Sequence, residues 1–256
     1  MGKNPQSRAG FTLVEVAIVL LVVTILLGYT VALFPIQQDL KKSRQAEHEL
    51  DQIVEQLIAF AQVNGRLPCP DTDVGAPDGL ENVDADPTLG CDGFFGFLPG
   101  RTLGMNGNFD NGGRLLDPWG TGYGYAVSDV DSGDGNIDFV VANNIRVEGL
   151  SNVTADLSIC DDSPVLGNQT DCTAAGSNDV IVDVAAVVIS LGKDRGTIAS
   201  NIQAENTDDF GAGAMDDKVF VFSTRSDVSG AEFDDVVKWL PTNQLFSRMI
   251  EAGQLP

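Results

Sequence analysis

Histidine is nearly absent from this sequence, and positive charge is scarce. His48 is the only histidine among 256 residues, so neither a histidine-based catalytic triad nor a zinc site is expected. Acidic side chains number 37 and basic ones 15, which gives a formal charge of −22. A surface of that sign repels nucleic acid, so no nucleic-acid partner is expected. The same surface suits cations such as calcium, which takes oxygen ligands.

Common catalytic motifs are also missing. No G-x-S-x-G nucleophile motif occurs. The segment GTGYGYA, residues 120–126, has neither the G-x-G-x-x-G spacing nor the following helix of a nucleotide-binding turn. We therefore expect no enzymatic activity and no organic cofactor.

Cysteine is sparse as well, but its placement is informative. The four cysteines form two close pairs in the polar part of the chain, Cys69 with Cys91 and Cys160 with Cys172, and none makes a C-x-x-C motif. We predict two local disulfides with this pairing, with buried free thiols as the alternative. Disulfides would place this part of the chain in an oxidising compartment.

A long uncharged segment dominates the N-terminal region. From Val16 to Phe34, nineteen consecutive residues carry no charge, which is about the length of a helix that crosses a bilayer. No A-x-A-like cleavage site follows Phe34, so a cleaved secretory signal peptide is not expected. The segment predicts a membrane-spanning helix over residues 11–34.

An amphipathic helix is predicted next, over residues 35–64. Pro35 suggests a kinked join to the apolar segment, and Gly65 and Pro68 suggest the end of the helix. The apolar positions recur every three or four residues: Leu50, Ile53, Val54, Leu57, Ile58 and Ala61.

Glu15 interrupts the apolar character near the start of this region. A carboxylate in a membrane span costs a few kcal/mol and needs a partner. No basic residue lies between Phe11 and Gln38. If the leader were cut after Gly10, the new amine of Phe11 in a neighbouring copy could pair with Glu15 and drive the assembly of like subunits.

Residues 65–256 are predicted to form a β-rich globular head. Strands are expected in residues 117–127, 136–144, 179–192, 218–226 and 236–240, joined by loops rich in Gly, Asp and Asn, with a helix over Leu245, Met249 and Ile250. The expected fold class is therefore α+β: a long N-terminal helix packed on a mainly antiparallel sheet.

The N-terminal segment G-FTLVE followed by an apolar run resembles the class III signal of type IV pilins and type II secretion pseudopilins. The resemblance implies a short leader, residues 1–10, that a prepilin peptidase removes between Gly10 and Phe11. It also implies N-methylation of Phe11, and pairing of Glu15 with the N-terminus of an adjacent subunit in a filament.

Parts of the head are similar to the same family. DPWGTGYGY and VVISLGKDRG resemble segments of the major pseudopilin, whose following loop is implied to bind calcium. The matching positions are the Leu191 carbonyl, Asp194, Asp216 and Asp217. Residues 196–215 are inserted here relative to that family loop, and Asp208 and Asp209 within the insertion are the alternative ligands. A second acidic stretch, residues 129–138, resembles a calcium loop with altered spacing, but a β-hairpin turn is the favoured interpretation.

The expected function is that of a structural subunit, a minor pilin or pseudopilin of a type IV pilus-like filament. The alternatives are a type II secretion pseudopilin that drives exoprotein export, and a non-polymerising membrane-anchored adhesin or calcium-binding module. Expected partners are other pilin subunits, the prepilin peptidase, an inner-membrane assembly platform and the inner membrane. The head is expected in the periplasm before assembly, and in the filament or at the cell surface afterwards.

Overall fold

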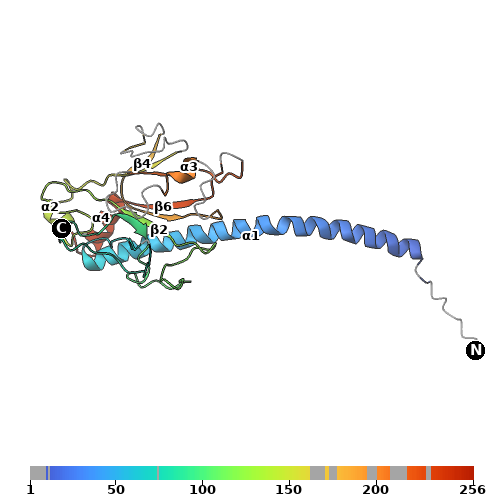
Figure 1. Cartoon of the computed structure of the whole chain (residues 1–256). Coiled ribbons are helices and arrows are strands. Elements are labelled where there is room, and N and C mark those ends of the chain that lie inside the picture. The colour runs from blue at the N-terminus through green and yellow to red at the C-terminus, as the bar shows by residue number, and fades with distance from the viewer. Residues whose placement is uncertain are drawn as a thin grey trace, which may run out of the picture. The chain divides into compact units, whose positions relative to one another are not determined.

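The computed structural model describes residues 10, 12–73, 75–161, 171–172, 178–194, 201–207, 218–228 and 232–256, with residues 29–36, 201 and 202 described by their backbone alone. The fold class is α+β, as the sequence predicts (Figure 1). Two compact units divide the chain, Met1–Lys41 and Lys42–Pro256. Each unit is therefore described separately below.

The first helix, α1, covers Leu13–Asn64 and contributes to both units. It continues through Pro35, although proline removes one backbone hydrogen-bond donor from the helix interior. Gly65 follows the last turn with a φ of 69°, and its N–H donates to the Ala61 carbonyl at 2.9 Å. A glycine in this left-handed conformation is a common helix end, so the predicted end of the helix is confirmed.

A mixed sheet of six strands forms the centre of the second unit, with the order β1-β2-β4-β3-β5 and β6 paired to β4. All pairs are antiparallel except β3 with β5. The strands are β1 (Phe95–Phe97), β2 (Gly124–Val127), β3 (Leu157–Cys160), β4 (Asp179–Ser190), β5 (Val219–Val221) and β6 (Val236–Pro241).

Strands β2 and β3 follow one another along the same edge of β4. Val127 of β2 is opposite Ala186, and Leu157 of β3 is opposite Val184. Strand β6 pairs with both of these β4 residues, so it occupies the other edge. The chain therefore leaves the β4 edge after β2, makes an excursion and returns to the same edge at β3.

The core of the second unit lies between the sheet and the C-terminal half of α1. The buried α1 residues are Ala46, Leu50, Ile53, Val54, Leu57, Ile58 and Ala61. These include all of the positions that the helical periodicity predicts. Helix α4 (Thr242–Glu251) follows β6 and is anchored to α1 by an Arg248–Glu55 ion pair of 2.7 Å.

The excursion between β2 and β3 contradicts the strand predicted over residues 136–144. Residues 138–140 form a turn, and the short helix α2 begins at Asn144 and ends at Glu148. Phe139 and Val140 are consecutive and both buried, whereas adjacent side chains of a strand point to opposite faces. These apolar side chains therefore pack into the core although their backbone forms a turn and not a strand. The hairpin turn favoured for residues 129–138 is also wrong, because no paired strands flank that loop.

Both predicted disulfides are present. Cys69 is bonded to Cys91 and Cys160 to Cys172. All four cysteines are buried, the first pair in the main core and the second pair against Val219. The remaining short helix, α3, covers Asn201–Ala204.

Candidate functional site

The first candidate site is the start of α1. Gly10 is exposed and precedes the helix, whereas Phe11 lies outside the described residues. The Thr12 hydroxyl accepts a hydrogen bond from the Glu15 N–H at 3.2 Å, and the Thr12 carbonyl accepts one from the Val16 N–H at 3.2 Å. Thr12 therefore caps the helix, in the T-x-x-E pattern typical of helix starts. Sequence reasoning missed this cap, although its signal is present.

Glu15 is exposed and lies in the first turn of α1. The partial positive charge of a helix N-terminus stabilises a carboxylate at that position by a few tenths of a kcal/mol to about 1 kcal/mol. This local role exists within one chain, and it leaves the carboxylate oxygens accessible to a second molecule.

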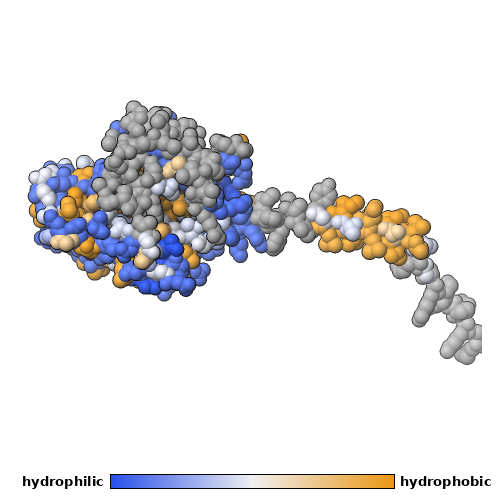
Figure 2. Space-filling view, viewed as in Figure 1, coloured by the Kyte–Doolittle hydropathy of each residue, from blue (hydrophilic) through white to orange (hydrophobic). Residues whose placement is uncertain are grey.

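The helix surface beyond Glu15 is apolar on every side. Figure 2 shows these side chains gathered over the N-terminal part of α1. The exposed large residues are Val16, Ile18, Val19, Leu20, Leu21, Val22, Val23, Ile25, Leu26 and Leu27. An exposed apolar surface of this extent is typical of a segment that contacts other protein or lipid. Over the part of the chain that the structure describes, no helix meets the length and hydropathy required to cross a membrane.

The second candidate site is a group of three carboxylates in the head, Asp194, Asp234 and Asp235. Asp194 follows the end of β4, and the two others precede β6, which is paired with β4. The three offer ligand oxygens within 4.8 Å of one another, so the group could hold a metal ion.

The turn after β4 packs closely against Asp234. The Asp234 carboxylate accepts hydrogen bonds from the N–H groups of Lys193, at 2.6 Å, and Asp194, at 3.3 Å. Gly192 has a φ of 61°, and a Cβ there would lie 2.5 Å from the Asp234 carbonyl oxygen. Only glycine suits both the conformation and the contact, which explains the glycine of the S-L-G segment.

Asp235 is the most buried member of this group. Its carboxylate accepts a hydrogen bond from the Asn206 side chain at 2.9 Å. Burial, together with the negative charges of Asp234 and Asp194, raises the pKa of Asp235 to about 8, although the hydrogen bond from Asn206 opposes that shift. A bound cation would favour the ionised form, because its positive charge offsets the loss of hydration on burial.

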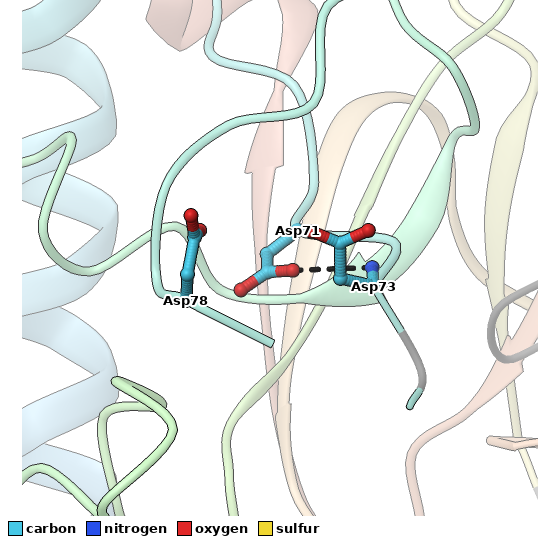
Figure 3. A group of neighbouring side chains, drawn as sticks. All are labelled: Asp71, Asp73 and Asp78. Carbon is cyan, nitrogen blue, oxygen red and sulfur yellow. Dashed lines mark hydrogen bonds between the residues drawn. The ribbon is translucent and has the colours of Figure 1, made fainter. Parts of the chain in front are cut away.

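A further acidic group lies in the loop after the first cysteine and consists of Asp71, Asp73 and Asp78 (Figure 3). Asp71 is fully buried, and it accepts hydrogen bonds from the N–H groups of Asp73, at 3.2 Å, and Gly79, at 2.7 Å. Asp73 and Asp78 are exposed. These bonds give Asp71 a structural role in the loop.

The calcium ligands predicted from the sequence are only partly described. Leu191 and Asp194 follow β4 as expected, whereas Asp216, Asp217, Asp208 and Asp209 lie outside the described residues. Asp234 and Asp235 were not predicted as partners of Asp194. Within residues 129–138, Asp131 accepts hydrogen bonds from the N–H groups of Gly133 and Gly135, at 2.8 and 3.1 Å, which close the loop.

Comparison with known proteins bears on the first site. The family model for the prokaryotic N-terminal methylation motif matches residues 5–31. The chain carries a class III prepilin signal. The match includes Gly10, Phe11 and Glu15, and it supports the resemblance of this segment to type IV pilins and pseudopilins. No curated protein and no solved structure matches the chain.

The prepilin signal has direct consequences for partners. A pilin or pseudopilin subunit is processed by a prepilin peptidase and associates with other pilin subunits. The cap at Thr12 places the start of α1 directly after the expected cleavage point. The helix of the processed subunit would therefore begin almost at its new N-terminus.

Proposed function

We propose that this chain is a structural, non-enzymatic subunit of a type IV pilus-like filament, most similar in role to a minor pilin. The match of residues 5–31 to the methylation motif carries this proposal. Cleavage after Gly10 and methylation of Phe11 would produce a subunit whose N-terminal helix joins the filament core.

The surface of α1 supports assembly through this helix. Burying an apolar side chain of the size of leucine or valine is worth about 1.5–3 kcal/mol, and the exposed apolar residues of α1 provide many such contacts. Contacts of this kind do not fix how two copies are aligned. A charge pair between Glu15 and the Phe11 amine of a neighbour would select one alignment along the helix axis.

The size of the head favours a minor subunit. The second compact unit covers Lys42–Pro256, and a bulky head hinders dense helical packing of many identical copies. A low-abundance position, such as the filament tip, accommodates such a head. Before assembly we place the subunit in the bacterial inner membrane, with its disulfide-bonded head in the periplasm, in contact with an assembly platform.

The Glu15 charge pair is tested by Glu15→Ala. We expect cleavage of the leader to continue, while the amount of subunit in sheared filaments falls at least about tenfold, because removing one partner of a buried ion pair costs about 3–5 kcal/mol. Immunoblots of whole cells and of sheared filaments measure the two effects. Glu47→Ala is the matched control, since Glu47 is an exposed glutamate of the same helix.

Processing itself is tested in the same assay by Gly10→Val, which should leave the leader attached. Normal incorporation of the Glu15→Ala subunit would contradict the charge pair. Absence of both the wild-type subunit and its processed form from filaments would favour the other functions. A type II secretion pseudopilin would be recognised by lost exoprotein export on deletion, and a non-polymerising adhesin or calcium-binding module by an intact N-terminus.

A calcium site in the head is a second proposal, and the carboxylates of Asp194, Asp234 and Asp235 support it. Their oxygens lie close enough to share one ion, and calcium prefers such hard oxygen ligands. The Leu191 carbonyl belongs to the same turn and adds a further candidate ligand. Calcium would stabilise the turn that follows β4, residues 191–194.

A further inference from the structure

Lys218 lies between two carboxylates at the start of β5. Its Nζ contacts Oδ1 of Asp129 and is 3.1 Å from Oδ2 of Asp156. The side chains of Lys218, Asp129 and Asp156 are 13 %, 21 % and 28 % exposed. The three groups are therefore largely withdrawn from water, unlike the Lys238–Asp51 pair of the same head, whose carboxylate is 63 % exposed.

The backbone around this triad is held in place from three directions. The Ser158 N–H donates to the Lys218 carbonyl at 2.8 Å, which continues the pairing of β3 with β5. The Ser128 hydroxyl donates to Oδ1 of Asp156 at 2.7 Å. The Ala155 N–H donates to the Asp183 carboxylate at 2.7 Å, in β4. These bonds hold the backbone of Lys218 and the carboxylate of Asp156 in place beside Asp129.

The surroundings also favour the protonated form of the Asp129 carboxyl group. Burial raises the pKa of Asp129 above its ordinary value, although the bond from Lys218 opposes that shift. Transfer of one proton from the Lys218 ammonium to the Asp129 carboxylate gives a neutral amine and a carboxylic acid with no change in net charge. The reaction proceeds from this neutral pair, and burial of the Asp129 carboxyl group favours its protonated form.

We propose that Lys218 and Asp129 condense into an intramolecular amide cross-link, with Asp156 as the group that carries the proton. The neutral Nζ attacks Cγ of the protonated Asp129 carboxyl group, and the N–C bond forms. The Asp156 carboxylate accepts a proton from the attacking nitrogen and gives it to the departing hydroxyl. The C–O bond then breaks, and one water molecule leaves. No oxidant or reductant is required, because the step is a condensation.

Fixed geometry is the main contribution of the fold to this reaction. Holding two reacting groups in contact replaces a bimolecular encounter and contributes a large part of the rate of intramolecular reactions. Asp156 is within hydrogen-bond reach of the nitrogen, as a general base must be. The product would join the end of β2 to the start of β5 at the point where β3 returns to the β4 edge.

Peptide mapping of the full-length protein tests this proposal directly. The protein is denatured, its disulfides are reduced and the chain is digested with trypsin. We expect the peptide 115–146, which contains Asp129, to be joined to the peptide 196–225, in which Lys218 is not cleaved, with a total mass lower by one water molecule. Recovery of 115–146, 196–218 and 219–225 as separate, unmodified peptides would overturn the cross-link and leave an ordinary ion pair.

Variants identify the role of each group. Lys218→Arg retains the positive charge and should abolish the cross-link, whereas Lys238→Arg, the matched control in the exposed ion pair, should retain it. Asp156→Asn should reduce the cross-linked fraction at least tenfold, and an unchanged fraction would overturn its role as proton carrier. Water loss confined to a single peptide with an Asp-Gly pair, such as 134–135, would indicate a succinimide and also count against the proposal.

Discussion

Asp234 shows how one side chain organises a turn that the sequence only partly predicts. Its carboxylate accepts bonds from Lys193 and Asp194 after β4, and from the Gln203 side chain at 2.7 Å. The S-L-G segment drew attention to Asp194, which the structure places beside Asp234 and Asp235. Its partners follow forty residues later, and among 37 acidic residues nothing in the sequence distinguishes them. Only the pairing of β6 with β4 brings them to Asp194.

Calcium binding by this group is testable through thermal stability. At a free calcium concentration of ~100 times Kd, binding adds about 2.7 kcal/mol to the free energy of unfolding. For a head of this size that corresponds to a rise in Tm of about 5–10 °C. We expect Asp194→Asn to abolish the rise, measured by thermal denaturation of the full-length protein, and magnesium to produce a smaller one.

Asp73→Asn is the matched control, since Asp73 belongs to the other acidic group. It should leave the calcium effect unchanged. Loss of the effect in Asp73→Asn but not in Asp194→Asn would place the ion at Asp71 instead. A wild-type Tm that does not respond to calcium would reject both sites.

At the scale of elements, segments with a periodic or β-branched pattern were predictable, and segments without one were not. The apolar spacing of α1 and α4 and the β-branched composition of β4 and β6 predicted these elements correctly. Strands β1 and β3 were not predicted, whereas β2 and β5, which are equally short, lie within segments whose apolar residues alternate. Residues 136–144 have the composition of a strand. Residues 138–140 of this segment form a turn instead, and the consecutive apolar side chains of that turn are buried in the core.

The buried face of α1 gives a prediction for this helix. Leu57 is fully buried, whereas Val63, on the same helix, is 77 % exposed. Leu57→Ala should lower the free energy of unfolding of the head by about 2–5 kcal/mol, because it removes apolar contacts and leaves a cavity. Val63→Ala should change it by less than about 0.5 kcal/mol. Urea denaturation measures both, and equal effects would contradict the packing of α1 described here.

At the scale of the whole molecule, the division at Lys41 separates two kinds of surface. The first unit presents apolar side chains outward, whereas the second buries them in its own core. The long uncharged segment predicted the exposed apolar surface of the first unit. The amphipathic spacing of the following helix predicted the buried face in the second unit. The position of the division within one continuous helix was not predictable, because it depends on where the head begins to cover α1.

We therefore expect residues 42–256 to fold without the first unit. An expressed fragment with these residues should unfold cooperatively in urea, contain both disulfides and remain absent from sheared filaments. Gel filtration, thiol titration and immunoblotting check the three statements. A fragment that is unfolded or aggregated when oxidised would show that the apolar half of α1 is needed for the head.

The burial of the cysteines sets an order of events for the newly made protein. Cys69 and Cys91 lie within the main core, at 0 % and 2 % exposure, where no oxidising enzyme can reach a sulfur atom once the head has closed. Oxidation must then come before the core is complete. A subunit would therefore be ready to join a filament only after an oxidising enzyme has formed this disulfide. Disulfide formation would thus control which subunits are available for filament growth.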